Sequence, residues 1–411
     1  MTDKTQANRA QKTFDGTAVG PLDGVRVLDL SRLVSGNVLS MLLGDFGADV
    51  VKIEPLGGDP LREWKDAGAS LFWKTYSRNK KSLALNLRMP EAKEVLLKLV
   101  ATADALVENF KPGTLEVMGL APEVLWAANP DLVIVRISGF GQDGPYSSLP
   151  GFGSLVEAMS GLAARTGFAD REPVLPPFPV ADMVAGIYGA MATLVALRAR
   201  EHNLARGQVV DLSLLEPLFS LLGPEAAIFQ LTGQVKERCG SASNTTAPRN
   251  VYRCSDGKYV ALSGSMQSMA TRIFDEIGRS DMNLDPRFSN NTARIANRDA
   301  VDQALGEWFA SETREEALEA MRAAEATVGP VYNIDDAMED EHFIAREIIV
   351  DVADDDLGTI PMANIVPRLS ETPGTWRLPA PKIGEHTAAL LAEIGMTPSE
   401  IEKLRDIGAS V

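Results

Sequence analysis

Short apolar blocks alternate with amphipathic stretches through the first half of the chain. The apolar blocks are rich in Val, Ile and Leu, which is typical of strands buried on both faces of a parallel sheet. We expect strands over 25–30, 48–54, 82–87, 105–108, 132–137 and 207–212. Helices are expected between them at 38–46, 90–101, 114–119 and 121–128. This alternation predicts an α/β fold with a Rossmann-like, doubly wound parallel sheet.

The first two predicted strands and the helix between them form a βαβ unit. An acidic residue, Glu54, closes the second strand, as it does in dinucleotide-binding folds. The turn after the first strand, residues 31–37, reads Ser-Arg-Leu-Val-Ser-Gly-Asn and lacks the Gly-x-Gly-x-x-Gly fingerprint. A nicotinamide-dependent dehydrogenase is therefore disfavoured.

The longest apolar stretch follows Asp182. Residues 183–197 carry no charge and predict a buried helix whose first turn begins at Asp182. Gly186, Gly189 and Ala190 would let another backbone come close to this helix. Because the uncharged run is shorter than the roughly 20 residues that a bilayer requires, we expect no membrane span.

Two roles are open to Asp182 at this position. As an N-cap, its carboxylate would satisfy free N–H groups of the first helical turn. As a nucleophile, it would be kept ionised by the helix dipole and could form a covalent acyl intermediate. Position alone does not decide between the two roles.

The pattern of apolar and polar residues changes near residue 233. The polar run 240–250 is loop-forming, and Ser255-Asp-Gly257 marks a hairpin. Helices are expected after it at 266–277, 298–310 and 313–324. We therefore expect four segments, namely a flexible N-terminal extension over 1–20, a large Rossmann-like domain over 21–225, a linker with a small α+β domain over 226–345, and a return segment over 346–411 that completes the large domain.

Composition narrows the functional class. The 411 residues carry a net charge of −16, and 45% of them are hydrophobic, which is enough for two domains with cores. The acidic balance disfavours a nucleic-acid partner. Cys239 and Cys254 are the only cysteines, which favours a reducing cytoplasm. Since His202, His342 and His386 are scattered, no metal site is expected.

Eight sequence blocks, in order from about residue 20 to the C-terminus, resemble the class III CoA-transferase (CaiB/BaiF) family. Each block is short, but together they are highly specific. They are Leu22-Asp-Gly-Val-Arg-Val-Leu-Asp-Leu-Ser-Arg, Gly47-Ala-Asp-Val-Val-Lys-Ile-Glu, Gly57-Gly-Asp-Pro-Leu-Arg62, Glu108-Asn-Phe-Lys-Pro-Gly113, Ile137-Ser-Gly-Phe-Gly-Gln-Asp-Gly-Pro-Tyr146, Asp182-Met-Val-Ala-Gly186, Gly207-Gln-Val-Val-Asp211 and Gly384-Glu-His-Thr387.

The resemblance implies an interlocked homodimer, in which each subunit has a large Rossmann-like domain and a smaller domain. It also implies that Asp182 matches the catalytic aspartate of the family. In that chemistry the carboxylate attacks an acyl-CoA thioester, which gives a mixed anhydride and the CoA thiolate. Exchange with a carboxylic acid acceptor then returns a new thioester. No metal, histidine or permanently bound cofactor takes part.

Coenzyme A carries a 3′-phosphate and a pyrophosphate, so its site needs cations and backbone donors. The resemblance implies that it is bound by Val34, Ser35, Leu87, Arg88, Asn109, Phe110 and Lys111. Arg88 and Lys111 are the candidates for phosphate or adenine contacts, although each would also fit a solvated cationic surface. Val117 stands where many family members carry a basic CoA contact. The run 240–250 matches a glycine-rich active-site loop of some members, but with one glycine it would equally serve as a linker.

Two other functions compete with CoA transfer. Racemases with this fold need a His/Asp pair, but residues 151–153 read Gly-Phe-Gly where their histidine lies, and no histidine occurs in 1–201. A non-catalytic CoA-binding protein is the second alternative, and the presence of Asp182 argues against it. Residues 151–161 and 366–374 look most like members that use succinyl-CoA and a small dicarboxylate. A dicarboxylate would need one more cation near Asp182, which the sequence does not identify.

Overall fold

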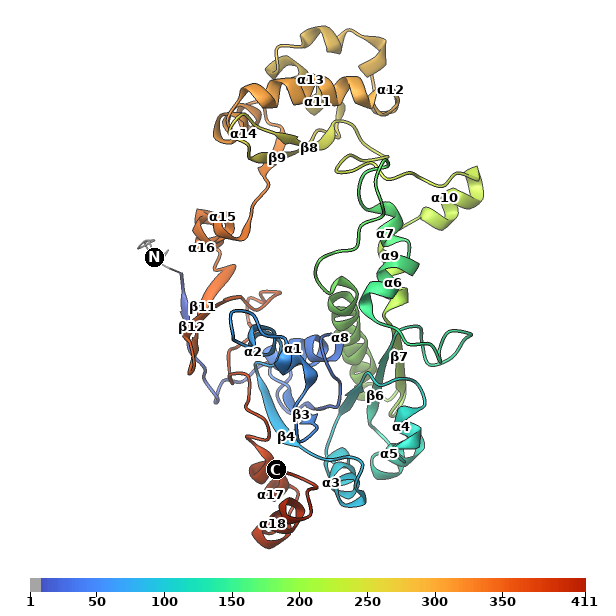
Figure 1. Ribbon diagram of the computed structural model, residues 1–411, viewed down its shortest axis with the longest axis vertical. Helices are drawn as coiled ribbons and strands as arrows, with labels where there is room; N and C mark the ends of the chain where they lie inside the picture. Colours follow the sequence, from blue (N-terminus) through green and yellow to red (C-terminus); the bar gives the residue numbers. More distant parts are fainter. Residues whose placement is uncertain (1–8) are drawn as a thin grey trace. The chain divides into compact units, whose positions relative to one another are not determined.

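The computed structural model describes residues 9–411, which form two compact units (Figure 1). The first unit comprises 9–162, Leu175–Gly223 and His342–Val411, and the second comprises Ala163–Val174 and Pro224–Glu341. The structure differs from the expected division at 163–174, which belongs to the second unit rather than to the large domain. Residues 1–8 of the expected N-terminal extension lie outside the described residues.

A six-stranded sheet forms the centre of the first unit. Its strands are β2 (Arg26–Asp29), β3 (Asp49–Glu54), β4 (Lys80–Ala84), β5 (Ala105–Glu108), β6 (Val133–Ser138) and β7 (Val209–Ser213). All its pairings are parallel, and the strand order is β4-β3-β2-β5-β6-β7. The chain builds outward from β2 in one direction and from β5 in the other, as in a doubly wound sheet. The predicted α/β class with a large parallel sheet is confirmed.

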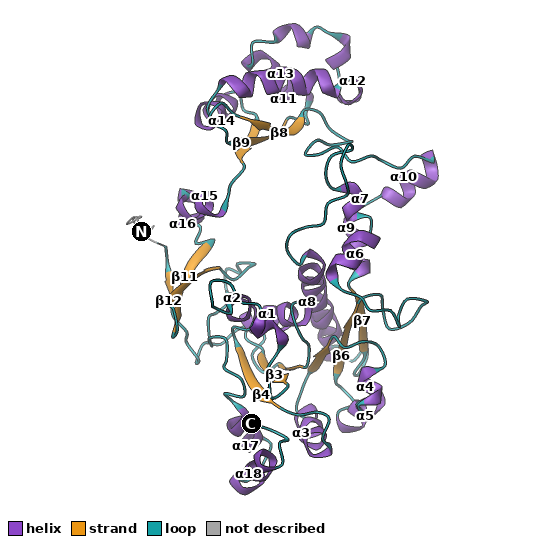
Figure 2. Ribbon diagram, viewed as in Figure 1, coloured by secondary structure: helices purple, strands orange, loops and turns teal. Residues whose placement is uncertain are grey.

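Helices cover both faces of this sheet (Figure 2). Because successive strand residues point to opposite faces, Val27 packs in one core and Leu28 in the other. The Val27 side carries α1 (Ser35–Asp45) and α8 (Val180–Glu201). The Leu28 side carries α3 (Pro90–Val100), α5 (Pro122–Ala128), α17 (Thr387–Glu393) and α18 (Pro398–Asp406). Further helices of this unit are η1 (Pro60–Glu63), α2 (Leu71–Tyr76), α4 (Thr114–Val117), α6 (Gly153–Met159) and α9 (Leu215–Leu221).

Two glycines let α8 pack closely on α1, as the sequence predicts. A Cβ on Gly186 would lie 2.7 Å from Val38 Cγ1, and one on Gly189 would collide with Leu39. The start of α8 differs from the prediction, because the helix begins at Val180 directly after Pro179. Asp182 is therefore the third residue of the helix and not its N-cap.

By length and composition alone, α8 could cross a membrane. The helix has 22 residues, and its most apolar 18-residue window has a mean hydropathy of 1.7. The helix is therefore longer than the uncharged run 183–197 from which we expected no membrane span. Part of this apolar surface, 44% of the most apolar window, is buried against the protein. A core helix of a folded domain passes the same test.

A small sheet joins distant parts of the first unit. Strand β1 (Gln11–Lys12) pairs in parallel with β11 (Ile349–Asp354), which pairs antiparallel with β12 (Gly358–Ala363). Arg9 Nε also lies 3.0 Å from Asp351 Oδ1. Residues 9–12 are thus anchored, and the expectation of a flexible extension does not hold for them.

The second unit is built from an antiparallel sheet and helices. Its strands, in the order β10-β9-β8, are β8 (Arg249–Arg253), β9 (Tyr259–Ser263) and β10 (Thr327–Pro330). The predicted hairpin at 255–257 connects β8 and β9. The helices are α10 (Glu225–Thr232), α11 (Gln267–Glu276), α12 (Asn291–Ala296), α13 (Arg298–Ser311), α14 (Arg314–Ala323) and α15 (Ile334–Glu339), with α7 (Leu162–Arg165) and α16 (Glu341–Ala345) at the borders between the units.

Candidate active site

The strand order reverses between β2 and β5, and open α/β sheets bind ligands at the carboxyl ends of the strands at such a point. The turn 31–35 leaves β2 there, and Asn109 follows β5. The Asn109 side chain accepts a hydrogen bond from the Arg32 N–H at 2.8 Å and donates one to the Arg32 carbonyl at 2.7 Å. Asn109 Nδ2 also lies 3.3 Å from Ser35 Oγ. Asn109 therefore ties the two segments together.

The turn 31–35 contains a strained residue, Leu33, whose φ of 61° is unfavourable for a side chain of this size. Its N–H donates to Asp59 Oδ1 at 3.0 Å, and its carbonyl accepts from Asn37 Nδ2 at 2.6 Å. The same Asn37 nitrogen donates to Asp59 Oδ2 at 2.9 Å. These contacts hold the turn and thereby fix Ser35 at the start of α1.

A buried ionic cluster holds Asp59 in turn. Lys52 Nζ lies 2.9 Å from Asp59 Oδ2 and 3.3 Å from Asp29 Oδ1, and Lys80 Nζ lies 3.3 Å from Asp29 Oδ2. Burial alone would raise the pKa of Asp59, but the Lys52 charge and several hydrogen bonds lower it to about 2. Burial lowers the pKa of Lys80 to about 8. Asp59 is therefore an ionised, paired, structural carboxylate.

Asp182 lies in the first turn of α8, next to Ser35. The hydroxyl and the backbone N–H of Ser35 donate hydrogen bonds to its carboxylate. Burial raises the pKa of Asp182 to about 6, and the charge of Glu157 adds to this rise, whereas the Ser35 hydrogen bonds oppose it. Within residues 9–411 this carboxylate has no ion-pair partner. At pH 7 it is mostly ionised, yet it is held by neutral donors alone.

Glu157 is a second carboxylate at this site. It lies on α6 with 3% of its surface exposed, and its Oε1 accepts a hydrogen bond from the Ala181 N–H at 3.1 Å. A Cβ on Gly153 would lie 2.9 Å from Asp182 Oδ2. Gly153 therefore places no side chain against Asp182. In the sequence, this glycine lies within the Gly-Phe-Gly run that stands where racemases carry their histidine motif.

A cavity of about 510 Å³ opens beside Asp182. Of the residues that the family resemblance assigns to CoA binding, Ser35, Asn109, Phe110 and Lys111 line this cavity. The structure thus brings these four residues together with the predicted nucleophile.

The other three predicted CoA-binding residues lie outside the lining of this cavity. Val34 is buried in an apolar cluster with Val38. Leu87 packs against the core on the α3 side of the sheet, and the Arg88 side chain is exposed. Val117, at the position where many family members have a basic residue, is 88% exposed.

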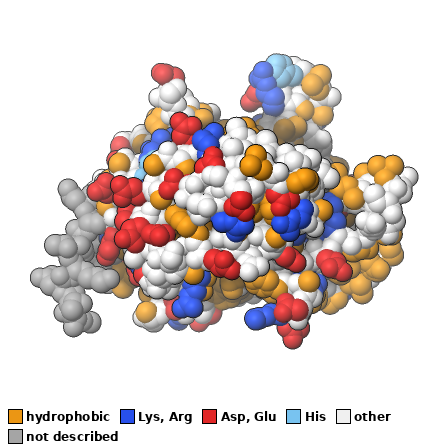
Figure 3. Space-filling view, turned by 90° about the horizontal axis from the view of Figure 1, so that it is seen from above, with side chains coloured by type: hydrophobic (Ala, Val, Ile, Leu, Met, Phe, Trp, Pro, Cys, Tyr) orange, Lys and Arg blue, Asp and Glu red, His pale blue; other side chains and the backbone are white. Residues whose placement is uncertain are grey.

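Sequence reasoning missed Arg32, the second cation that lines the cavity beside Lys111. Its guanidinium lies 5.3 Å from the centre of the Phe110 ring, and within residues 9–411 neither cation forms an ion pair. Figure 3 shows acidic and basic side chains mixed on one face of the molecule, whose net charge is −16. The sequence could have indicated Arg32 by its position, because Arg32 lies three residues after the end of β2, a strand that borders the reversal.

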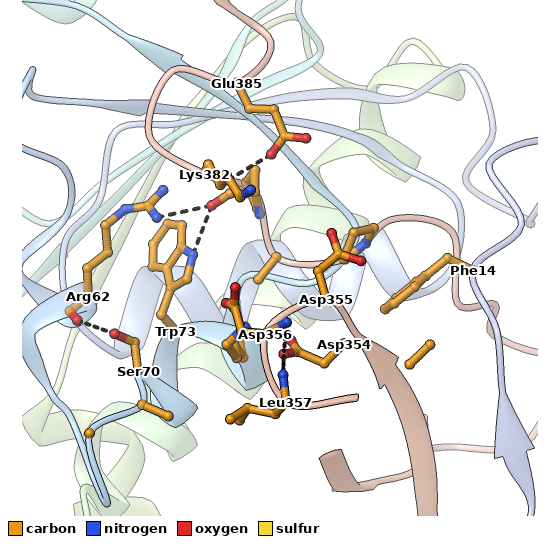
Figure 4. A pocket seen from close by; sticks show the side chains of 17 residues that line it. Phe14, Arg62, Ser70, Trp73, Asp354, Asp355, Asp356, Leu357, Lys382 and Glu385 are labelled. Atoms are coloured by element: carbon orange, nitrogen blue, oxygen red, sulfur yellow. Dashed lines mark hydrogen bonds and ion pairs between the residues drawn. The ribbon is translucent and has the colours of Figure 1, made fainter. Parts of the chain in front are cut away.

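A second cavity, of about 480 Å³, lies elsewhere in the first unit (Figure 4). Two of its cations, Arg62 and Lys74, are paired inside the protein. Arg62 lies 2.6 Å from Glu54 and 3.6 Å above the Trp73 ring, and Lys74 Nζ lies 2.6 Å from Asp354. Lys382 also lines this cavity and forms no ion pair within residues 9–411, so a cation without an ion-pair partner occurs at both cavities. The cavity beside Asp182 is distinguished instead by its place where the strand order reverses.

Neither the histidines nor the run 240–250 line the Asp182 cavity. Phe152, at the position of the racemase histidine, lines it without supplying an imidazole. The run 240–250 lies in the second unit, where Asn244 accepts a hydrogen bond from Arg165 at 2.7 Å. Within residues 9–411 no group of three or more His, Cys, Asp or Glu residues is arranged to hold a metal ion.

Comparisons with known proteins identify the family of the chain. Residues 22–387 match the model of CoA-transferase family III. The chain is 39% identical over 390 residues to succinyl-CoA–D-citramalate CoA-transferase of Chloroflexus aurantiacus, covering 94% of this chain and 97% of that protein. It is also 39% identical over 392 residues to the alpha subunit of succinyl-CoA–L-malate CoA-transferase of the same organism, covering 94% and 91% of the two chains.

Among solved structures, a CaiB/BaiF family protein from Brucella suis is similar to this chain with a TM-score of 0.81 and 31% identity. The similarity covers 92% of this chain and all of that protein. The family model matches most of the chain, and the relatives align over almost their whole length. The predicted resemblance is thus confirmed, and the chain belongs to CoA-transferase family III and is a CoA-transferase.

Proposed function

We propose that the enzyme transfers CoA from succinyl-CoA to a small dicarboxylate through a mixed anhydride on Asp182. The observation that carries this proposal is the environment of the Asp182 carboxylate. Burial raises its pKa to about 6, so it is largely ionised at pH 7, and it has no ion-pair partner within residues 9–411. A carboxylate of raised basicity without a counter-ion is a better nucleophile than a salt-bridged one.

The first step forms the anhydride. An Asp182 carboxylate oxygen attacks the thioester carbonyl of the donor, the carbon–sulfur bond breaks, and CoA leaves as a thiolate. The Ser35 hydroxyl and N–H orient the attacking carboxylate and remain beside the anhydride oxygens. The cavity lining keeps the thiolate close, because CoA is proposed to lie along Ser35, Asn109, Phe110 and Lys111.

The second step exchanges the acid. A carboxylate oxygen of the acceptor attacks the Asp182 carboxyl carbon, and succinate leaves, so that the anhydride now carries the acceptor. The CoA thiolate attacks the acyl carbon of the acceptor and releases the Asp182 carboxylate. One thioester is consumed and one is formed, and no external oxidant, reductant or proton source enters the balance.

Two observations support a dicarboxylate acceptor. Two similar relatives are named as succinyl-CoA-dependent transferases for D-citramalate and L-malate. The Asp182 cavity carries Arg32, which has no ion-pair partner within residues 9–411. A guanidinium binds a carboxylate in bidentate fashion, so Arg32 supplies the extra cation that the distal carboxylate of such an acid requires.

We further propose an interlocked homodimer in the cytoplasm. The resemblance to the family supports the dimer, and so does a set of large apolar side chains that the first unit leaves exposed. On α8 and α9 these are Ile187, Met191, Val195, Phe219 and Leu221. The two free cysteines fit a reducing compartment.

The test is mass spectrometry of the intact protein after incubation with succinyl-CoA and trapping with hydroxylamine, beside an Asp182→Ala control. We expect an adduct on the peptide that contains Asp182, and none in the variant. An adduct with another acyl-CoA alone would refute the donor. No adduct with any acyl-CoA, together with solvent hydrogen exchange at the α-carbon of the acyl group, would refute the anhydride and favour racemase chemistry.

A further inference from the structure

The carboxylate of Glu157 is buried without a cation. Its Oε1 accepts the N–H of Ala181, the second residue of α8, at 3.1 Å. This N–H is one of the donors in the first turn that a helix itself cannot satisfy. No Lys, Arg or His within residues 9–411 forms an ion pair with Glu157. A neutral acceptor such as glutamine would cap the helix equally well, so the cap alone does not require a charge here.

The two carboxylates face the same small space. A Cβ built on Gly153 would lie 2.9 Å from Asp182 Oδ2 and 3.8 Å from Glu157 Oε1. Any side chain at 153 would therefore press on the Asp182 carboxylate. The glycine keeps the space between the two acids free of protein atoms, and the acids act on each other across it.

The other groups around Asp182 do not neutralise this pair. From α1, Ser35 contributes neutral donors. From the cavity lining, Arg32 and Lys111 contribute cations that form no ion pair within residues 9–411. The repulsion from Glu157 acts on Asp182 and, together with burial, raises the pKa of that residue.

We propose that Glu157 is a positioning residue that anchors the first turn of α8 and holds a negative charge beside Asp182, and that this charge drives the ionised nucleophile toward its neutral acyl anhydride. The inference rests on the proposed anhydride chemistry. Repulsion between the two acids is present while Asp182 is ionised and disappears when Asp182 is acylated. The ground state is thus raised relative to the intermediate.

This role links two measurable quantities, the pKa of Asp182 and the equilibrium between its ionised and acylated forms. Protonation and acylation both remove the charge of Asp182, so removal of the Glu157 charge disfavours both neutral forms by a similar factor. One pKa unit corresponds to about a tenfold change in such an equilibrium. A purely structural cap predicts no such link, because glutamine at 157 would accept the Ala181 N–H as glutamate does.

The test compares the full-length wild type with Glu157→Gln. At a fixed ratio of succinyl-CoA to CoA and at one pH, we expect the fraction of acylated Asp182, measured by intact-protein mass spectrometry, to fall about tenfold in the variant. The acid limb of the acylation rate should move down by about one pH unit. A matched control is Asp211→Asn, which removes a carboxylate that accepts the Gln142 N–H at 3.0 Å, and should leave both quantities unchanged.

The ionisation of Asp182 is also followed without any reaction, by the carbon-13 NMR titration of its side-chain carboxyl, assigned by the difference from Asp182→Asn. A lowered midpoint in Glu157→Gln supports the inference even where the wild type forms no adduct, an outcome that would refute the proposed function instead. An unchanged midpoint, with an unchanged melting temperature, would reduce Glu157 to a helix cap and overturn the inference.

Discussion

Asp182 and Asp59 are both removed from most solvent in the same unit, yet they have opposite environments. Asp59 is paired with Lys52 at 2.9 Å, and its pKa is lowered to about 2. Asp182 has neutral donors and a like charge nearby, and its pKa is raised to about 6. Both acids are ionised at pH 7, but pairing stabilises one, whereas the other is kept at high free energy.

The difference in environment matches a difference in role, since Asp59 is a structural carboxylate and Asp182 is the proposed nucleophile. Asp59 holds the strained Leu33 turn and the start of α1, and this requires a carboxylate that never changes its charge. In the proposed mechanism Asp182 loses its charge when it is acylated, and a lysine partner would oppose that change. The protein places the paired carboxylate behind the turn and the unpaired one at the cavity.

The largest expected effect comes from removal of the unpaired carboxylate. Asp182→Asn should lower the transfer rate by at least about 10⁴-fold, because no other group can form the anhydride. The folded-state pKa is raised, so the wild-type carboxyl stabilises the fold below about pH 3.8, and this stabilisation is lost as pH rises through about 6. At pH 7 the variant should therefore be equally stable or more stable, by about 1–2 kcal/mol after allowance for solvent screening.

This prediction is checked by steady-state kinetics and by urea unfolding at pH 7. The wild-type rate should fall about tenfold for each pH unit below 6, provided that acylation limits turnover. An inactive variant that is also strongly destabilised would contradict the comparison, since Asp182 would then be a structural carboxylate like Asp59.

Removal of the paired carboxylate should instead act on stability. Asp59→Asn leaves Lys52 with a buried, partly uncompensated charge, which should cost about 3–5 kcal/mol of unfolding free energy. Because the pKa of Asp59 is lowered, its contribution is present above about pH 3.8 and is lost as pH falls through about 2. Urea unfolding as a function of pH tests both statements.

The matched control for this pair is Asp356→Asn, since Asp356 pairs with Lys74 at 2.8 Å and its side chain is 68% exposed. That exposed pair is screened by solvent, so its loss should change stability far less than the loss of the Asp59 pair. If the two variants lose equal stability, burial does not make the Asp59–Lys52 pair more important for stability than the exposed Asp356–Lys74 pair.

The smallest expected effect sharpens the substrate assignment. Arg32→Gln should raise the KM for a dicarboxylate acceptor about tenfold, because the distal carboxylate loses a charged partner. The KM for a monocarboxylate of similar size should change little, and so should the KM for acetyl-CoA as donor. Steady-state kinetics measure the KM values for the dicarboxylate, the monocarboxylate and acetyl-CoA. Lys111→Gln, which removes the other cation that lines the cavity, is the matched control. An equal rise for all CoA esters would assign Arg32 to the CoA phosphates.

The sequence was informative wherever the physics is local. Alternating apolar blocks predicted β5 over Ala105–Glu108 with the observed bounds, and the spacing of Gly186 and Gly189 predicted a close approach to α8. The match of motifs predicted Asp182 as the nucleophile. We predicted that the first turn of α8 begins at Asp182, because a carboxylate is common at the start of a helix. The helix begins two residues earlier, at Val180, directly after Pro179.

Neighbours of Asp182 were decided only by the tertiary structure. Ser35, Glu157 and Asp182 lie on three different helices, so no local spacing relates them. In the sequence, Lys52 is a single charged residue within a predicted strand. Only the tertiary structure shows that its side chain is fully buried and paired with Asp59.

By itself, the sequence determined the parallel α/β sheet and the family, and it predicted Asp182 as the nucleophile, because these depend on hydrophobic periodicity and on short motifs. The tertiary structure decided which carboxylate is paired and which is left without a counter-ion. The physical reason is that desolvation and charge interactions depend on distances between residues that are far apart in the chain, and folding alone sets those distances.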